Sequence, residues 1–274
     1  MKLFNRMSDT TTIDKPTDEE RAPPTRDEFW FYGPIAMSLF IVVWELATTW
    51  SDVPELYLPR PSVIVAALCD LIVNKGLLVD LGVTLYRIFA GFFLAAAIGI
   101  VLGILMGTSR RMYAICDIFI AAIYPIPKIS LLPLIVIWLG SGNMSLVALS
   151  ALACIFPILV NTIVGVRQCD EGLILAARDL GATRGQIQRK VVLPAAIPSI
   201  FAGLRLALGI SIIMVVAAEM QLSKFGIGAR LTHSGSVLET GQVFAMLILL
   251  AIVGIALTKA QDRIDRLIGR WRTR

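Results

Sequence analysis

Long apolar runs alternate with short polar segments along most of this chain. The runs that are long enough to cross a membrane cover residues 31–50, 82–107, 112–140, 144–164, 200–222 and 241–258. A helix rises about 1.5 Å per residue, so a span needs roughly 20 residues. The shorter apolar run within 51–80 is predicted to be a surface helix. The pattern therefore predicts an all-α, polytopic membrane protein with about six transmembrane helices.

The third run is interrupted by prolines. Pro125, Pro127 and Pro133 lie within 112–140, and each removes a backbone donor from a helix. Irregular backbone at membrane depth is tolerated only against protein or a water-filled cavity. We therefore expect this stretch to line a path through the membrane.

The second run is rich in glycine. Gly99 and Gly103 have GxxxG spacing, which lets helix backbones approach closely. We expect this pair to pack helices within one subunit, and a seam between two subunits is the alternative.

Composition agrees with a membrane protein. Hydrophobic residues make up 57% of the 274 residues and charged residues 16%, with a mean hydropathy of +0.77. Soluble domains have about 45–50% apolar and about 25% charged residues. Because so small a chain cannot hide this apolar excess in one core, the bilayer is its natural solvent.

The positive charges predict the orientation of the chain. The net charge is +5, and Lys and Arg gather in 1–28, 110–111, 165–199 and 259–274. Cytoplasmic segments carry this excess, so both termini and the loop 165–199 are predicted to face the cytoplasm. The charges lie between apolar runs, which argues against a nucleic-acid partner.

Three regions follow from this pattern. Residues 1–28 are predicted to form a disordered cytoplasmic tail, because they are polar, mixed in charge and contain prolines. Residues 29–264 form the transmembrane domain, and residues 265–274 form a basic cytoplasmic tail.

Motifs of catalysis and metal binding are missing from the sequence. The four cysteines form no C-x-x-C pair, a single histidine (His233) falls in a predicted outer loop, and H-E-x-x-H and G-x-S-x-G do not occur. No G-x-x-x-x-G-K-[ST] loop is present to hold nucleotide phosphates. We expect no enzyme activity, no metal site and no cofactor in this chain.

Charged residues inside predicted spans each cost about 2.5–3.5 kcal/mol on insertion scales, and they include Arg87, Lys128, Arg205 and Glu219. We expect Arg87 and Arg205 to reach the interface, while Glu219 lies close to the predicted path and could pair with Arg87. Lys128 lies at the break, where a new half-helix would begin near Ser130.

A cation beside a helix N-terminus favours an anion, so the cargo is predicted to be a small anion that passes Lys128. The alternative is a salt bridge or a carbonyl-capping role for this lysine. The predicted path consists of Pro125, Pro127, Lys128, Pro133 and Glu219.

The loop 165–199 is the longest polar stretch between spans and carries helix signals. Asp170 is suited to cap a helix over 171–180, with Glu171 in its first turn, and Gly181 follows as a helix-ending glycine. Thr183 and Gln186 have capping-box spacing for a second helix over 184–193, which Pro194 is predicted to stop. The loop is therefore predicted to be a rigid knob.

This loop resembles the EAA loop of ATP-binding-cassette importer permeases, whose pattern is E-A-A-x3-G-x9-I-x-L-P. Ala176, Ala177, Gly181, Leu193 and Pro194 match at the right spacing. Leu175 stands at the glutamate position and Val191 at the isoleucine position, which puts one polar contact in doubt.

Other segments are similar to the nitrate, sulfonate and taurine branch of this family. They are LPRPSVIVAAL, TLYRIFAGF, YPIPKISLLPLIVIWLG, FPILVNTIVGV, VVAAEM and FGIGARL. The resemblance covers roughly residues 55–270 and implies the type I importer permease fold in the plasma membrane.

The resemblance also implies partners and a mechanism. A pair of permease chains, most simply a homodimer, would work by alternating access with two ATPase subunits that hold ATP and Mg, and with an external substrate-binding protein. The residues expected to couple this chain to the ATPase are Glu171, Ala176, Ala177, Asp179, Gly181, Leu193 and Pro194. An ion-gradient-driven secondary transporter and a non-transporting membrane scaffold are the alternatives.

Overall fold

The computed structural model describes residues 31–51 and 53–269, and within these ranges the chain forms helices and turns without a β-strand. The predicted tail 1–28 and residues 270–274 lie outside the described residues. The described chain falls into two compact units, divided after Asp52. The first unit contains α1 (Tyr32–Trp50), and the ring of its N-cap residue Phe31 stacks on that of Tyr32 with centroids 4.7 Å apart.

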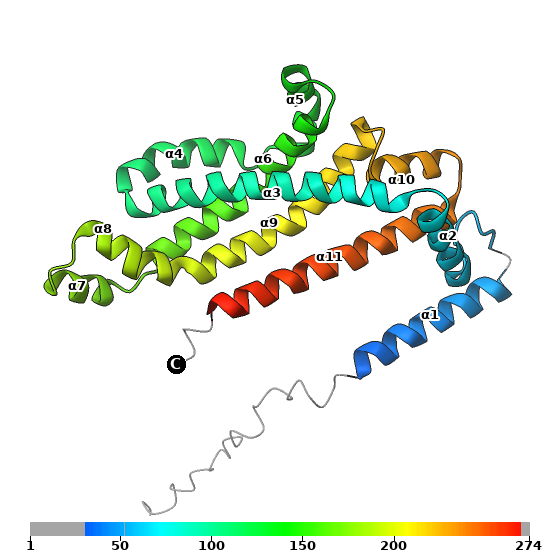
Figure 1. Ribbon diagram of the computed structural model, residues 1–274, viewed down its shortest axis with the longest axis horizontal. Coiled ribbons are helices and arrows are strands. Elements are labelled where there is room, and N and C mark those ends of the chain that lie inside the picture. The colour runs from blue at the N-terminus through cyan, green and yellow to red at the C-terminus, as the bar shows by residue number, and fades with distance from the viewer. Residues whose placement is uncertain (1–30, 52, 270–274) are drawn as a thin grey trace, which may run out of the picture. The chain divides into compact units, whose positions relative to one another are not determined.

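The second unit begins at Val53 and contains all the remaining described helices (Figure 1). Its α-helices are α2 (Pro61–Val73), α3 (Leu77–Thr108), α4 (Arg110–Ile123), α5 (Leu132–Leu139), α6 (Asn143–Arg167), α7 (Glu171–Asp179), α8 (Arg184–Ile187), α9 (Leu193–Leu222), α10 (Ile227–Ser236) and α11 (Thr240–Gly269). A 3₁₀ turn, η2 (Lys128–Leu131), precedes α5, and a π-helical turn, η3 (Gln188–Val192), joins α8 to α9.

The predicted spans are confirmed as helices. Among the described residues, five helices are long and apolar enough to cross a membrane. A sixth span results if α4 is taken together with η2 and α5, which are bent by 88° relative to α4. This bend lies at the predicted proline-rich break.

Helices α3, α6 and α9 form the centre of the second unit. Ala95 of α3, Ile158 of α6 and Ala207 of α9 are all fully buried in one cluster. Polar contacts cross this core, since the Ser150 and Ser211 hydroxyls lie 2.9 Å apart and Ser211 donates to the Ile88 carbonyl at 3.1 Å.

A line of glycines on α3 allows this close packing. A Cβ at Gly99 would lie 3.1 Å from Ile158, and one at Gly103 would lie 2.5 Å from the Thr162 Cβ. Both contacts are with α6 of the same chain, so the predicted role of the GxxxG pair in packing within the subunit is confirmed.

The second loop helix does not stop at Pro194, contrary to the prediction from the sequence. Residues 184–222 form one continuous helical segment through α8, η3 and α9. Directly before Pro194, the Leu193 N–H donates to the Gln188 carbonyl five residues back, and this wider π turn accommodates the ring. The knob therefore contains one free-standing helix, α7, and the end of a transmembrane helix.

Two further boundaries differ from expectation. Helix α11 runs to Gly269, so the predicted division at residue 264 falls within a helix. His233 lies in α10 rather than in a loop, although its side chain is exposed as expected. Apolar α11 continues helically into its charged end because no proline or glycine interrupts it between Lys259 and Gly269.

Candidate functional site

The predicted coupling loop, of which residues 168–192 connect α6 to α9 in the structure, is organised by local hydrogen bonds at both ends of α7. The Asp170 carboxylate accepts from the Gly172 N–H at 2.7 Å, and Glu171 lies in the first turn. Both acids face the positive end of the helix dipole, which favours them there. The predicted cap is confirmed.

Helix α7 ends in a Schellman turn. Gly181 adopts φ +80°, its N–H donates to the Arg178 carbonyl at 2.9 Å, and the Ala182 N–H donates to the Ala177 carbonyl at 3.0 Å. A residue with a Cβ is strained in this left-handed conformation. The predicted glycine cap is confirmed, and it reverses the chain within two residues.

The chain then enters α8 through a capping box. The Thr183 N–H donates to the Gln186 side-chain oxygen at 2.8 Å, and the Gln186 N–H donates to the Thr183 hydroxyl at 3.4 Å. Two backbone donors that a helix start leaves free are satisfied in this way. The turn between α7 and α8 is thus held from both sides.

An apolar core fixes the loop to the membrane helices. Cys169, Ile187 and Val192 are buried together with Val166 of α6 and Ala196 of α9. The half-buried side chains that pack on this cluster include Ile174, Ala177, Ala182 and Leu193.

The outer side of the loop is exposed and partly apolar. Leu180, at the reversal, is 89% exposed, and Leu173 and Leu175 are more than half exposed. Glu171, Ala176, Asp179 and Gly181 are also exposed, while Ala177, Leu193 and Pro194 are half-buried. The predicted coupling residues therefore divide into an exposed set and a set that supports it.

The broken segment between α4 and α5 turns around Pro125 and Pro127, and Pro133 lies in the first turn of α5. The Lys128 ammonium donates to the carbonyls of Ile123 and Ile126, each at 3.0 Å, and to that of Tyr124. It also lies 4.7 Å from the centre of the Phe156 ring. These contacts match the carbonyl-capping alternative for Lys128.

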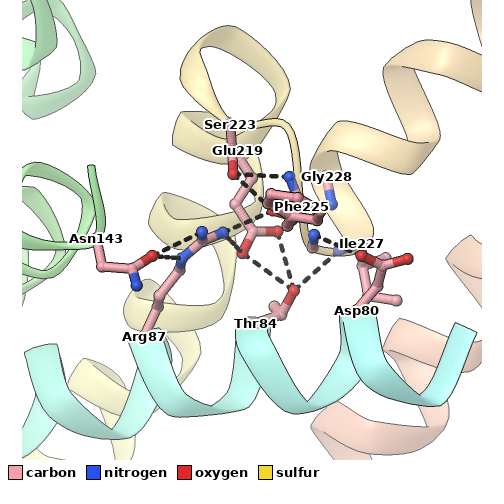
Figure 2. Close-up of polar contacts among 10 residues, drawn as sticks. Asp80, Thr84, Arg87, Asn143, Glu219, Ser223, Phe225, Ile227 and Gly228 are labelled. Atoms are coloured by element: carbon pink, nitrogen blue, oxygen red, sulfur yellow. Dashed lines mark hydrogen bonds and ion pairs between the residues drawn. The ribbon is translucent and has the colours of Figure 1, made fainter. Parts of the chain in front are cut away.

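A buried polar network joins α3, α6, α9 and the start of α10 (Figure 2). It lies at the opposite end of the α3–α6–α9 core from the coupling loop. Arg87 of α3 donates from Nη1 to Glu219 Oε1 of α9 at 2.7 Å, and the two residues are 4% and 0% exposed. The pairing that the sequence allowed is therefore present. Glu219 is enclosed in this network, and its predicted place on the path stays a prediction.

The same network caps the start of α10. The N–H groups of Gly226 and Gly228 donate to Asp80 Oδ1 and Glu219 Oε2, each at 2.9 Å, and the Ile227 N–H donates to the Thr84 hydroxyl at 2.9 Å. A helix start normally needs such acceptors, and here other helices supply them. Carboxylates at this end also suit the helix dipole.

Thr84, Asp80 and Asn143 were missed by sequence reasoning. Thr84 donates to the Glu219 carboxylate at 3.0 Å, Asp80 also pairs with Arg230, and Asn143 accepts from Arg87. Asp80, Thr84 and Arg87 have i, i+4, i+7 spacing, which places them on one helix face. That polar stripe beside an apolar run was the sequence signal that could have indicated a buried polar network on this face of α3.

Arg205, the remaining charge in a span, pairs with the end of α11. Its Nη2 lies 2.7 Å from Asp262 and 3.3 Å from Asp265, and its side chain is about half exposed. This position, near the coupling-loop end of α9, agrees with the expected location at an interface.

Comparisons with known proteins identify the family to which this helical chain is similar. Residues 99–273 match the family model described as "Binding-protein-dependent transport system inner membrane component". An aliphatic sulfonates transport permease of Bacillus subtilis is 33% identical over 92% of each chain. The taurine transport system permease of Escherichia coli K12 is 32% identical over 86% of this chain and 87% of its own.

A solved structure shares the fold. An inward-facing structure of the methionine ABC transporter MetNI covers 70% of this chain and 95% of its own, with a TM-score of 0.61 and 24% identity. The fold is therefore that of a type I importer permease. The family model covers more than half of the chain, so this protein belongs to the binding-protein-dependent transport system inner membrane components.

Proposed function

We propose that this chain is the transmembrane permease subunit of an ATP-driven importer, and that separate ATPase subunits grip its coupling loop. The observation that carries the proposal is an exposed apolar tip on a rigid support. Leu180 is 89% exposed, yet the turn beneath it is held by a Schellman motif and a capping box. An exposed leucine on fixed backbone suits a partner's groove, because little conformational entropy is lost on docking.

The helix arrangement suits the transmission of force from that tip. Helix α9 continues from the coupling loop without a break and ends at Leu222, beside the network around Glu219. A rigid segment from 184 to 222 would rise about 58 Å at 1.5 Å per residue, which exceeds the membrane core. A movement imposed at the loop would thus reach the far side of the membrane.

The proposed assembly has two permease chains, two ATPases that hold ATP and Mg, and an external substrate-binding protein. Both termini and the coupling loop face the cytoplasm, as the Lys and Arg distribution favours. The path follows the broken segment around Lys128, where the irregular backbone lies. Cargo passes as the two chains alternate between inward and outward openings.

The proposed cargo is a small solute with an oxyanion group. The relatives named for sulfonates and taurine are similar to this chain over most of its length. Lys128 adds a cation at the break, in contact with Tyr124 and Phe156. The substrate-binding protein is expected to select the individual solute.

Co-purification and uptake test this function. The full chain, expressed with its candidate ATPase and binding protein, should co-isolate with the ATPase and import the binding protein's ligand into liposomes only with ATP. The ligand itself can be identified by native mass spectrometry of the purified binding protein. Uptake driven by an ion gradient without ATP would contradict the proposal.

A substitution at the exposed Leu180 can test docking of the ATPase without disturbing the folding of the permease. Leu180→Glu places a charge on the tip, where no described side chain covers it, and should abolish ATPase co-isolation while the permease stays folded. Leu267→Glu on α11, a leucine that is 65% exposed, is the matched control and should keep the complex. Equal binding of the ATPase by both variants would exclude the tip as the docking site.

A further inference from the structure

A polar depression lies beside the Arg87–Glu219 pair, at the end of the core opposite the coupling loop. Its volume is about 420 Å³, within the range of small-ligand pockets. Its polar or charged lining residues are Arg87, Ser141, Asn143, Ser223 and Lys224, and Leu146, Leu222 and Phe225 add apolar surface. Two lining residues are cationic and none is acidic, and because Glu219 neutralises Arg87, the uncompensated positive charge is that of Lys224.

Arg87 orients the donors in this depression. Its Nε and Nη2 both donate to the Asn143 side-chain oxygen, at 2.9 and 2.8 Å, so the Asn143 amide nitrogen points away from the guanidinium (Figure 2). Nη1 is taken by Glu219 and by the Phe225 carbonyl. A guanidinium has five N–H groups, so one on Nη2 remains for a ligand.

Further donors surround the same space. Lys224 is exposed and makes no ion pair with any described residue, and Ser141 adds a hydroxyl. Helix α6 starts at Asn143 with Gly142 as its N-cap, and no side chain caps its first turn. The free N–H groups of a 25-residue helix therefore face this region, and they favour negative charge.

The acceptors nearest to these donors are already engaged. The Ser223 hydroxyl donates to the Phe225 carbonyl at 2.6 Å and accepts from the Phe225 N–H at 3.2 Å. The Glu219 carboxylate is enclosed behind Arg87 and takes no part in the lining. The polar part of the depression thus presents donors and the charge of Lys224, beside an apolar wall.

We propose that this depression is an entry site that binds a small oxyanion, such as a sulfonate or sulfate group, before it reaches the central path. Arg87 acts as a positioning residue for Asn143 and supplies one N–H, while Asn143, Lys224 and the α6 N-terminus complete the binding of the oxygens. This inference rests on the proposed import of an oxyanion and assigns it a site on the outer side.

Thiol labelling tests the site without ATP, so it is independent of transport. The full chain with Ser141→Cys, and with Cys69 and Cys116 replaced by serine, is placed in phosphatidylcholine nanodiscs. The anionic reagent MTSES should react faster than the cationic MTSET. Sodium sulfate should slow MTSES labelling, compared with sodium gluconate at the same ionic strength.

Two variants test the residues. Lys224→Gln should lower the MTSES-to-MTSET rate ratio about two- to tenfold, because one charge at contact range is removed. Asn143→Ala should abolish sulfate protection and leave the ratio near its original value. Lys75→Gln, an exposed lysine on the loop before α3, is the matched control and should change neither measurement.

Three results would overturn the proposal: no preference for MTSES, no protection by sulfate, or protection that survives both Lys224→Gln and Asn143→Ala. Nanodiscs that contain phosphatidylglycerol address the other source of an oxyanion. If that lipid protects the thiol introduced by Ser141→Cys and sulfate does not, the depression holds a lipid headgroup. Failure here with intact ATP-driven uptake would leave the proposed function standing.

Discussion

At the scale of single residues, burial separates the charged groups of this chain by role. Arg87 and Glu219 are enclosed and satisfy each other, whereas Arg205 is half exposed and bridges to α11. A buried charge without its partner is costly, whereas exposed pairs contribute about 0–1 kcal/mol. Loss of the Arg87 pair should therefore lower the stability of the protein far more than loss of the Arg205 pair.

Glu219→Gln tests the buried pair. The substitution leaves the Arg87 charge enclosed without a counter-ion, so we expect a loss of about 3–5 kcal/mol in stability. Thermal unfolding of the detergent-purified protein measures this. Glu239→Gln, an exposed acid on the loop before α11, is the control and should change stability by about 0.5 kcal/mol or less. Similar melting temperatures for both variants would contradict the structural role.

Lys128→Met tests the lysine at the break. Three carbonyls lose a charged donor, so we expect a less ordered break and a large fall in ATP-dependent uptake at normal expression. Lys128→Arg retains the charge and should retain a substantial part of the uptake. Uptake that is unchanged in Lys128→Met would remove this residue from the path.

At the scale of elements, glycines decide where helices meet and where they end. On α3 they allow contact with α6, and at Gly181 a positive φ ends α7. Apolar burial alone does not drive the contact of α3 with α6, because lipid tails are as apolar as the helix surfaces. Close backbone packing and local hydrogen bonds provide the specificity.

Gly103→Leu tests the contact between α3 and α6. Its Cβ would lie 2.5 Å from the Thr162 Cβ, so the helices must separate, and we expect a clear drop in thermal stability. Gly82→Leu on the same helix meets no atom within 4 Å and serves as the control. Size-exclusion profiles after heating report the difference. A lower stability for Gly82→Leu than for Gly103→Leu would refute the packing argument.

Gly181→Val tests the Schellman turn. A β-branched residue at φ +80° is strained by about 1–3 kcal/mol, so the tip that carries Leu180 should be displaced. We expect weaker ATPase association and slower uptake with little change in the melting of the membrane helices. Gly185→Val, at an open position in α8, should be nearly neutral for both.

At the scale of the whole molecule, the two ends of the second unit carry different chemistry. The coupling loop is exposed and apolar at its tip, whereas the network and the polar depression occupy the other end. An importer needs this asymmetry, because energy arrives on one side of the membrane and solute on the other.

Cysteine labelling of intact cells tests the orientation. With Cys69 and Cys116 replaced by serine, a membrane-impermeant maleimide should label Ser236→Cys at the end of α10 and should label Gly185→Cys only after the cells are opened. The native Cys169 in the loop should stay silent, because burial and the neighbouring Asp170 raise the pKa of its thiol. The reverse labelling pattern would place the coupling loop outside.

The sequence alone determined what depends on local order and composition. Apolar length predicted the spans, the prolines predicted the break, and Asp170, Gly181, Thr183 and Gln186 predicted the caps, because each signal acts within a few residues. The tertiary structure alone decided which distant polar groups meet, as Asp80, Thr84 and Asn143 joined Arg87 and Glu219. The tertiary structure also decided that the helix continues through Pro194. A π turn accommodates the proline ring, although a proline at this position usually predicts the end of a helix. Those outcomes depend on how α3, α6, α9 and α10 pack. The sequence allowed Arg87 to pair with Glu219, 132 positions away, but it did not indicate which other groups surround that pair.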